Sequence, residues 1–182
     1  MPHEKNMEMN IYTDECTLVR SIKHISLNFP SIISIDGVDG VGKSTLACKI
    51  AEELNVPHIE IDAFVQAEQE GYIKYIDYDR LGERIVQDLI SNQMIIVEGI
   101  CVQQVLEKLS LTPYASVYVK VIDSYGFWMD QIRLFPPDRS VGEMIDERKA
   151  KCFSLGHVEE IIRYHYTFKP HENADCIFER RR

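Results

Sequence analysis

The sequence predicts a three-layer α/β fold, in which a doubly wound, mainly parallel sheet of about five strands has helices on both faces. Short apolar segments alternate with amphipathic helical segments along most of the chain, as in strands joined by crossover helices. The apolar segments are continuous and rich in β-branched residues, which is typical of strands buried on both faces. A chain of 182 residues also suits one such domain.

The predicted elements follow one another in a regular order. After a loose leader over residues 1–13, a helix is expected from TDECTLVRSIKHISL, with Thr13 as its cap. Strands are expected over residues 31–35, 58–61, 94–98, 116–121 and 174–178. Helices are expected over residues 43–54, 79–91 and 101–109, and in several segments between 125 and 166. Pro136 and Pro137 predict an exposed loop within the last region.

Composition restricts the classes of partner. The chain has 20 basic and 29 acidic residues, a formal net charge of -9, so we expect no broad surface for nucleic acid or anionic lipid. The five cysteines are widely spaced without a CxxC pair, which predicts free thiols in a reducing cytosol. The sequence contains no apolar run of the ~18 residues that a membrane span needs. We therefore expect a cytoplasmic protein, and leave open whether it forms a homo-oligomer.

The segment GVDGVGKS, residues 37–44, is a full GxxxxGK[ST] phosphate-binding loop. An apolar strand precedes it and a helix follows, so that its backbone N–H groups and the helix dipole can bind a phosphate. Lys43 is expected to reach the β- and γ-phosphates, and Ser44 to offer its hydroxyl to Mg²⁺. The residues expected to bind the nucleotide are Gly37, Val38, Asp39, Gly40, Val41, Gly42, Lys43, Ser44 and Thr45.

Two acidic residues are expected at strand ends near this loop. Glu98 ends the strand MIIVE and is a candidate ligand or second acid for Mg²⁺; the alternative is that it caps a helix beginning at Ile100. Asp62 follows the strand HIEI and could accept a proton from an acceptor hydroxyl while supporting the metal. The alternative for Asp62 is a helix cap or a loop carboxylate. Glu60 is expected to face away from its neighbours as part of the scaffold.

The segment after Asp62 has candidate residues for the acceptor. Residues 62–78 contain Phe64 and three tyrosines, which could stack on a flat acceptor or serve ordinary packing. Asp77 and Asp79 precede or begin a helix, where one is expected to be a cap and the other could bind sugar hydroxyls.

The motifs in this order resemble the uridine kinase and phosphoribulokinase group of P-loop kinases. The matching stretches are GVDGVGKST, IDAF, DYDRL, IIVEGI, SVYVKV and FKPHENADCIF. The resemblance covers roughly residues 31–178 and implies a P-loop NTPase fold for a kinase-like domain, residues 29–182, behind an N-terminal extension with a helix, residues 1–28. The loop alone is also similar to that of thymidylate kinase, which has an aspartate at the position of Asp39.

The resemblance implies roles for individual residues. It assigns the glycines of the loop, Lys43, Ser44 and Thr45 to ATP phosphates, Asp62 to the catalytic base, Glu98 to the acid near Mg²⁺, and Asp79, or else Asp77, to the acceptor sugar. The arginine-rich lid of that group is changed here to DQIRLFPPDRSVGEMIDERKAKC. Arg133 or Arg139 is the candidate that stabilises charge on the transferred phosphoryl group, and surface arginines are the alternative.

We therefore expect a Mg²⁺-dependent and ATP-dependent phosphotransferase that acts on a hydroxyl of a small metabolite, most simply a nucleoside or related ribosyl compound. A nucleotide-dependent switch or binding module and a nucleoside monophosphate kinase are the alternatives. Asp39 is expected to point toward the acceptor or to a basic lid residue, because two anions in one pocket repel. The terminal ERRR, residues 179–182, is expected to be a solvated end.

Overall fold

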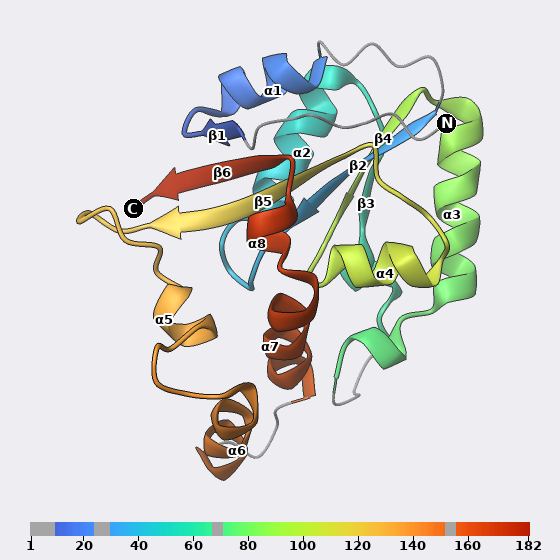
Figure 1. Cartoon of the computed structure of the whole chain (residues 1–182). Helices are drawn as coiled ribbons and strands as arrows, with labels where there is room; N and C mark the ends of the chain where they lie inside the picture. Colours follow the sequence, from blue (N-terminus) through green and yellow to red (C-terminus); the bar gives the residue numbers. More distant parts are fainter. Residues whose placement is uncertain (1–9, 24–29, 67–70, 152–155) are drawn as a thin grey trace, which may run out of the picture.

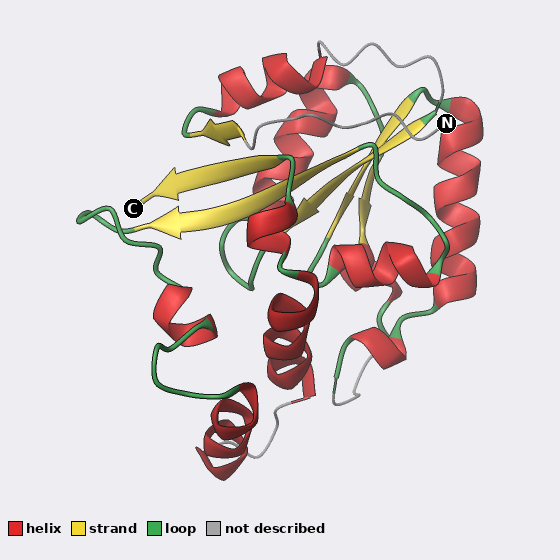
Figure 2. Cartoon of the chain, viewed as in Figure 1, coloured by secondary structure: helices red, strands yellow, loops and turns green. Residues whose placement is uncertain are grey.

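Six parallel strands form a single sheet with helices on both faces. The computed structural model describes residues 10–23, 30–66, 71–151 and 156–182. Within these ranges the strand order is β1-β6-β5-β2-β4-β3, and every neighbouring pair is parallel. Helices α1 and α2 lie on one face and α4, α7 and α8 on the other (Figures 1 and 2). This arrangement confirms the predicted three-layer α/β fold.

The two central strands are the most deeply buried part of the chain. Every residue of β2 (Ser31–Asp36) and of β4 (Met94–Glu98) is buried, which explains why both segments are apolar apart from two small serines in β2 and the last residue of each strand. On one side follow β5 (Ala115–Ile122) and β6 (Cys176–Arg181), and on the other β3 (His58–Glu60). The predicted strands agree with these bounds to within one or two residues at most ends.

The crossover helices also occupy their predicted places. The three that link the central strands are α2 (Lys43–Leu54), α3 (Tyr78–Ser91) and α4 (Val102–Lys108). Two short 3-10 turns, η1 (Ile61–Phe64) and η2 (Ile73–Tyr75), separate β3 from α3. The residues after β5 form α5 (Gln131–Leu134), α6 (Val141–Lys151), α7 (Gly156–Phe168) and α8 (Pro170–Asn173). The two prolines lie between α5 and α6, as predicted.

The N-terminal region differs from the expectation of a loose leader. Residues 1–9 lie outside the described residues, but Asn10–Tyr12 form β1, which pairs in parallel with β6. A strand of three residues has no recognisable pattern of its own, and the hydrogen bonds offered by the edge of β6 determine its conformation. Helix α1 (Glu15–Lys23) follows, and its cap is Asp14 instead of Thr13, because the Asp14 carboxylate accepts a hydrogen bond of 2.8 Å from the Thr17 N–H.

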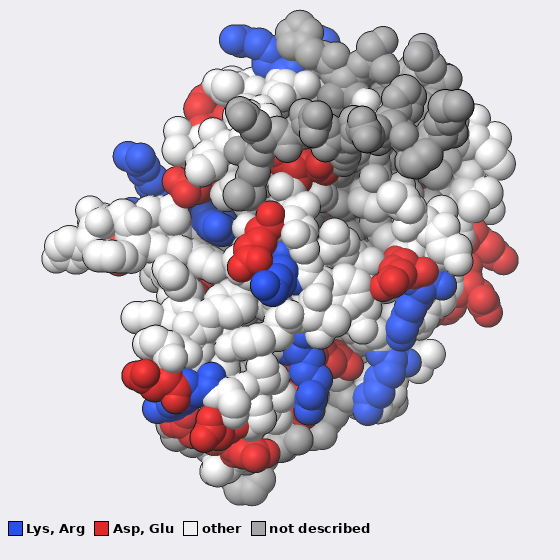
Figure 3. All heavy atoms as spheres, viewed as in Figure 1, with Lys and Arg blue, Asp and Glu red and all other residues white. Residues whose placement is uncertain are grey.

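The turn between β5 and α5 projects from the body of the molecule (Figure 1). Its large exposed side chains are apolar, with Tyr125 84% and Phe127 68% accessible, and the projection is nearly free of charged side chains in Figure 3. Elsewhere on the face shown there, acidic and basic side chains are interspersed. An anion on this face would therefore have to be bound by a local group of residues.

Two predictions about individual residue classes can be checked in the described part of the chain. Cys16, Cys48, Cys101 and Cys176 are free thiols there, as predicted, whereas Cys152 lies outside it. Among the helices described, none has the length and apolarity needed to cross a bilayer.

Candidate active site

The phosphate-binding loop connects the carboxyl end of β2 to the start of α2. It begins at Gly37, where a Cβ atom would lie 2.9 Å from the carbonyl oxygen of Val119 on β5, so only glycine allows this close approach. Val38 and Val41 are buried and fix the loop to the core. The two buried valines hold the loop against the sheet, and the lack of a side chain at Gly37 allows the close approach. Helix α2 begins directly after the loop.

Lys43 is the first residue of α2 and is 8% exposed. Its ammonium group donates a hydrogen bond of 2.9 Å to the carbonyl of Val38, so the side chain is folded back over the loop. A buried positive charge beside backbone N–H groups is suited to an anion with several negative charges. Lys43 therefore lies where the sequence motif predicts a phosphate-binding lysine.

Arg180 lies against the loop from the opposite side. Gly42 has φ 93°, and the Arg180 guanidinium occupies the space that a Cβ atom at this glycine would fill. The expected solvated end is confirmed in that Arg180, Arg181 and Arg182 are exposed, but β6 continues to Arg181, and this strand places the Arg180 side chain beside the loop. The sequence offered little to find it, since three consecutive arginines at a terminus resemble an ordinary charged tail.

Asp36, at the end of β2, links the loop to α7. Its carboxylate accepts a hydrogen bond of 2.7 Å from the Gly37 N–H and another from the Tyr164 hydroxyl. Burial raises the pKa of Asp36 to about 6, opposed by these two hydrogen bonds. The Tyr164 hydroxyl also accepts from the Gln103 N–H at 3.3 Å. This buried hydrogen bond fixes the start of the loop to α7, the helix that follows the arginine-containing segment. No sequence motif predicted it.

Glu98 ends β4 and is 3% exposed. Burial raises the pKa of its carboxyl group, while a hydrogen bond from Ser44 and the charge of Lys43 act in the opposite direction. Helix α4 begins only at Val102, and its cap position is Cys101, so Glu98 does not cap the helix. The carboxylate instead faces the loop, where it and the Ser44 hydroxyl offer the oxygen ligands that Mg²⁺ prefers.

Asp62 lies in the η1 turn directly after β3 and is exposed. One of its carboxylate oxygens accepts a hydrogen bond of 2.6 Å from the Tyr72 hydroxyl. The same tyrosine is held by its backbone, since its N–H and that of Ile73 donate to Glu160 of α7 at 2.6 and 3.1 Å. The negative charge of Asp62 lies near enough to contribute to the raised pKa of Glu98. Tyr72 and Glu160 were not predicted from the sequence, apart from the general richness of this segment in tyrosine.

The candidate acceptor residues fall into two groups. Phe64 is 8% exposed, and the Arg80 guanidinium lies 5.2 Å from the centre of its ring, which favours the packing role over stacking on a ligand. Asp77 caps α3, because its side chain accepts a hydrogen bond of 3.1 Å from the Arg80 N–H. Asp79 is exposed in the first turn of this helix. Of the two aspartates, Asp79 is the one whose carboxylate is not used as the cap.

Asp39, the additional carboxylate of the loop, points away from Lys43 and toward α7. Its neighbour there is His157, whose ring nitrogen is 3.7 Å from a carboxylate oxygen. Both side chains are about half exposed, at 54% for Asp39 and 47% for His157. His157 lies on α7, outside the segment 130–152 in which the lid was expected, so the expected contact of Asp39 with the acceptor or with a basic lid residue stays a prediction.

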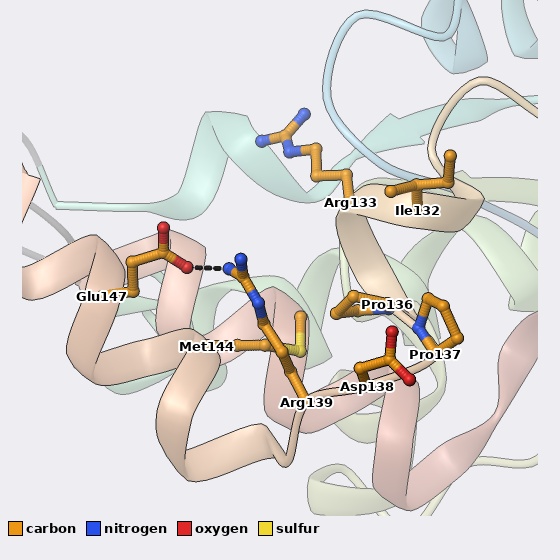
Figure 4. A pocket seen from close by; sticks show the side chains of 8 residues that line it. All are labelled: Ile132, Arg133, Pro136, Pro137, Asp138, Arg139, Met144 and Glu147. Atoms are coloured by element: carbon orange, nitrogen blue, oxygen red, sulfur yellow. Dashed lines mark hydrogen bonds and ion pairs between the residues drawn. The ribbon is translucent and has the colours of Figure 1, made fainter.

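The two candidate arginines line one cavity of about 320 Å³ between α5 and α6 (Figure 4). Arg133 extends from α5 and lies 3.6 Å from Asp130. Arg139 turns toward α6, where it forms an ion pair with Glu147 (Figure 4). Pro136, Pro137, Asp138 and Met144 complete much of the lining. The arginines are thus brought to the same hollow, with each guanidinium beside a local carboxylate.

Comparison with known proteins shows similarity at the level of structure. No family model matches the sequence, and no match was found among curated proteins. A possible uridine kinase from Bacillus stearothermophilus aligns over 90% of this chain and 96% of its own, with a TM-score of 0.57 and 16% identity. A candidate fructose transport system kinase from Silicibacter sp. TM1040 aligns over 92% of this chain and 100% of its own, with a TM-score of 0.50 and 12% identity.

These similarities define the fold class. The parallel six-stranded sheet, the flanking helices and the glycine-rich loop between β2 and α2 form a P-loop fold of the three-layer α/β type. The fold is shared with proteins described as kinases of small molecules, as the resemblance of the motifs implied. Because identities this low establish fold alone, the activity must be argued from the residues of the site.

Proposed function

We propose that the protein is a P-loop kinase that transfers the γ-phosphate of ATP to a hydroxyl group of a small metabolite in the cytoplasm. The observation that supports this most strongly is the meeting of three segments at one edge of the sheet. Strands β2, β4 and β3 are parallel neighbours, and their carboxyl ends bear the loop, Glu98 and Asp62 respectively. A phosphate-binding loop, a ligand for a divalent ion and a proton acceptor are thus close enough to act on one phosphoryl group.

The residues of the site have separate tasks in this reaction. Lys43 and the loop N–H groups would hold the phosphates, and the Ser44 hydroxyl with Glu98 would hold Mg²⁺. When bound, Mg²⁺ supplies charge neutralisation at the phosphate oxygens. Asp62 would accept the proton of the attacking hydroxyl, whose oxygen then forms the new bond to the γ-phosphorus as the bond to the leaving ADP breaks. Tyr72, through its hydrogen bond to Asp62, would orient this carboxylate.

The proposed class of acceptor rests on two exposed carboxylates, one on α3 and one on the phosphate-binding loop. Asp79 and Asp39 are exposed carboxylates, and carboxylates bind adjacent sugar hydroxyls well, since each oxygen accepts a hydrogen bond. The similarity to a possible uridine kinase is consistent with such an acceptor. We therefore propose a nucleoside or a related ribosyl compound, with Asp39 and Asp79 as its binding residues.

The test is to incubate the full chain with Mg²⁺, γ-labelled ATP and a panel of nucleosides, nucleoside monophosphates, sugars and vitamins. We expect label transfer to at least one hydroxyl acceptor and none with Lys43→Ala. Asp88→Asn is a matched control, because it removes a partly buried carboxylate of α3 that pairs with Arg84 and lies outside the site. Transfer to a monophosphate alone would identify the alternative kinase class. Release of the label as inorganic phosphate, with no labelled acceptor, would contradict the proposal and favour a nucleotide-dependent switch.

A further inference from the structure

Three potential metal ligands converge beside the candidate active site. They are His58 and Glu60 of β3 and Glu98 of β4, and one ligand atom from each lies within 4.8 Å of the others. His58 and Glu60 are two residues apart on one strand and so share a face of the sheet. Glu60 is the register partner of Glu98 on the neighbouring strand. The grouping therefore results from strand pairing and does not depend on loop conformation.

Within this cluster, two negative charges lie close together, and one buried nitrogen has no hydrogen-bond partner among the described residues. Two carboxylates stand side by side on adjacent strands, an arrangement that is destabilising without a positive partner. The Nε2 atom of His58 is buried and has no hydrogen-bond partner. It lies 3.8 Å from Glu98, which is too far for a hydrogen bond. A cation bound to all three side chains would remove both the repulsion between the carboxylates and the unmet bonding capacity of the imidazole.

We propose that His58, Glu60 and Glu98 form a binding site for a divalent transition-metal ion, with Zn²⁺ as its best occupant. One nitrogen and two carboxylate oxygens suit Zn²⁺, whereas Mg²⁺ prefers oxygen ligands alone. Ligand atoms on a tetrahedral zinc ion are about 3.4 Å apart, given bond lengths near 2.1 Å. The cluster would reach this separation by small side-chain rotations, because Glu60 is exposed and has room to move.

The site is accessible from the surface. His58 contributes to a surface hollow of about 500 Å³, lined on the α2 side by Cys48, Glu52 and Asn55 and closed by Asn92. An ion can therefore approach the His58 imidazole from this hollow.

Occupancy of this site would affect the neighbouring one. Glu98 also faces Ser44 and the phosphate loop, so its carboxylate would be shared between the transition ion and Mg²⁺. If the proposed kinase function is correct, Zn²⁺ bound here would weaken the binding of Mg·ATP. The existence of the site does not depend on that function, because Zn²⁺ binding can be measured without nucleotide.

The experiment is a titration of the full chain with ZnCl₂ against a chromophoric chelator, repeated with His58→Ala and Glu60→Gln. We expect each substitution to weaken binding at the site by at least about tenfold, as the loss of a ligand contact does. His157→Ala and Glu53→Gln are the matched controls and should bind like the wild type, since both side chains lie outside the cluster and outside the lining of the hollow. A cobalt-substituted sample should show a visible absorption band that His58→Ala abolishes.

Two results would overturn the proposal. One is equal affinity for Zn²⁺ in the wild type, His58→Ala and Glu60→Gln; the other is a cobalt band that persists without His58. Because Glu60 is exposed, Glu60→Gln should fold even if His58→Ala does not. Binding of Mg·ATP by His58→Ala, followed by thermal shift, separates failure of this inference from failure of the kinase proposal.

Discussion

The phosphate loop and the arginine-containing segment after β5 differ in how their charged side chains are held. Lys43 is 8% exposed and lies on a loop fixed by two buried valines and a close backbone contact at Gly37. The side chains of Arg133 and Arg139 are 44% and 51% exposed, and each is beside a local carboxylate. Under the proposed function, the lysine that binds the phosphates is fixed in the core. The arginines that would stabilise the transferred phosphoryl group must first leave the carboxylates of Asp130 and Glu147.

Substitution of the buried lysine should have the largest effect. Lys43→Ala removes the ammonium group that donates to the loop carbonyl of Val38, and we expect transfer to fall by at least about 10³-fold. The measurement is kcat/KM for the acceptor identified in the panel. Retention of more than a tenth of the activity would show that the loop is not the phosphate site.

The link between the loop and α7 should appear as a dependence of stability on pH. Burial raises the pKa of Asp36 from 3.8 to about 6, so binding of a proton by Asp36 stabilises the folded chain. This contribution is fully present below about pH 4 and is lost as the pH rises through about 6. The free energy of unfolding of the wild type relative to Asp36→Asn should therefore decrease by on the order of 3 kcal/mol between about pH 4 and pH 7.

Urea titrations of both proteins at several pH values measure this difference. Taking the difference removes the contributions of other groups, including His165 and His171, whose pKa values burial lowers to about 4. A difference that does not change with pH would mean that Asp36 is not the titrating group at this position.

The exposed arginines provide the next test. Helix α5 is the next helix after β5, whose neighbour β2 leads into the loop, so we expect Arg133 to be the arginine that acts on the phosphoryl group. Arg133→Ala should lower kcat by about 100-fold with little change in ATP affinity. Arg139→Ala, the matched control, should stay within about threefold of the wild type because this side chain is paired with Glu147. The reverse order of effects would transfer the role to Arg139.

A smaller effect is expected from the arginine on the last strand. Arg180 lies against Gly42, where its positive charge can support bound nucleotide. Arg180→Ala should raise the Kd for ATP by about tenfold, equivalent to about 1.4 kcal/mol. Arg182→Ala is the control and should bind as the wild type does. An unchanged Kd in Arg180→Ala would limit this residue to packing.

Much of the fold could be predicted because local pattern and tertiary structure agree. The buried runs before Asp36 and Glu98 were recognisable as central strands, and the glycines before Lys43 located the loop between a strand and a helix. Strand β1 was missed because its conformation comes from pairing with β6. A pattern in the local sequence cannot predict pairing with a strand that is distant along the chain.

The candidate site could be predicted only where it follows strand ends. Asp62 and Glu98 were found in this way, because parallel neighbouring strands bring their last residues together. Tyr72, Tyr164 and Arg180 reach the site from segments 10 to 138 positions distant along the chain, through contacts with Asp62, Asp36 and Gly42. Single-sequence patterns do not specify these long-range pairings. They also did not show which of Asp77 and Asp79 caps α3, which the hydrogen bond from the Arg80 N–H to Asp77 establishes.

The measurement that tests the central claim most directly is made on Asp62→Asn. Its binding of Mg·ATP is followed by thermal shift, and its phosphorylation of the acceptor by label transfer. If Asp62 is the base, ATP at 100 times its Kd should stabilise the variant by about 2.7 kcal/mol, as in the wild type. Its kcat should fall by about 10² to 10⁴-fold. Phosphorylation at the wild-type rate by Asp62→Asn would contradict the assignment of this carboxylate and the proposed mechanism with it.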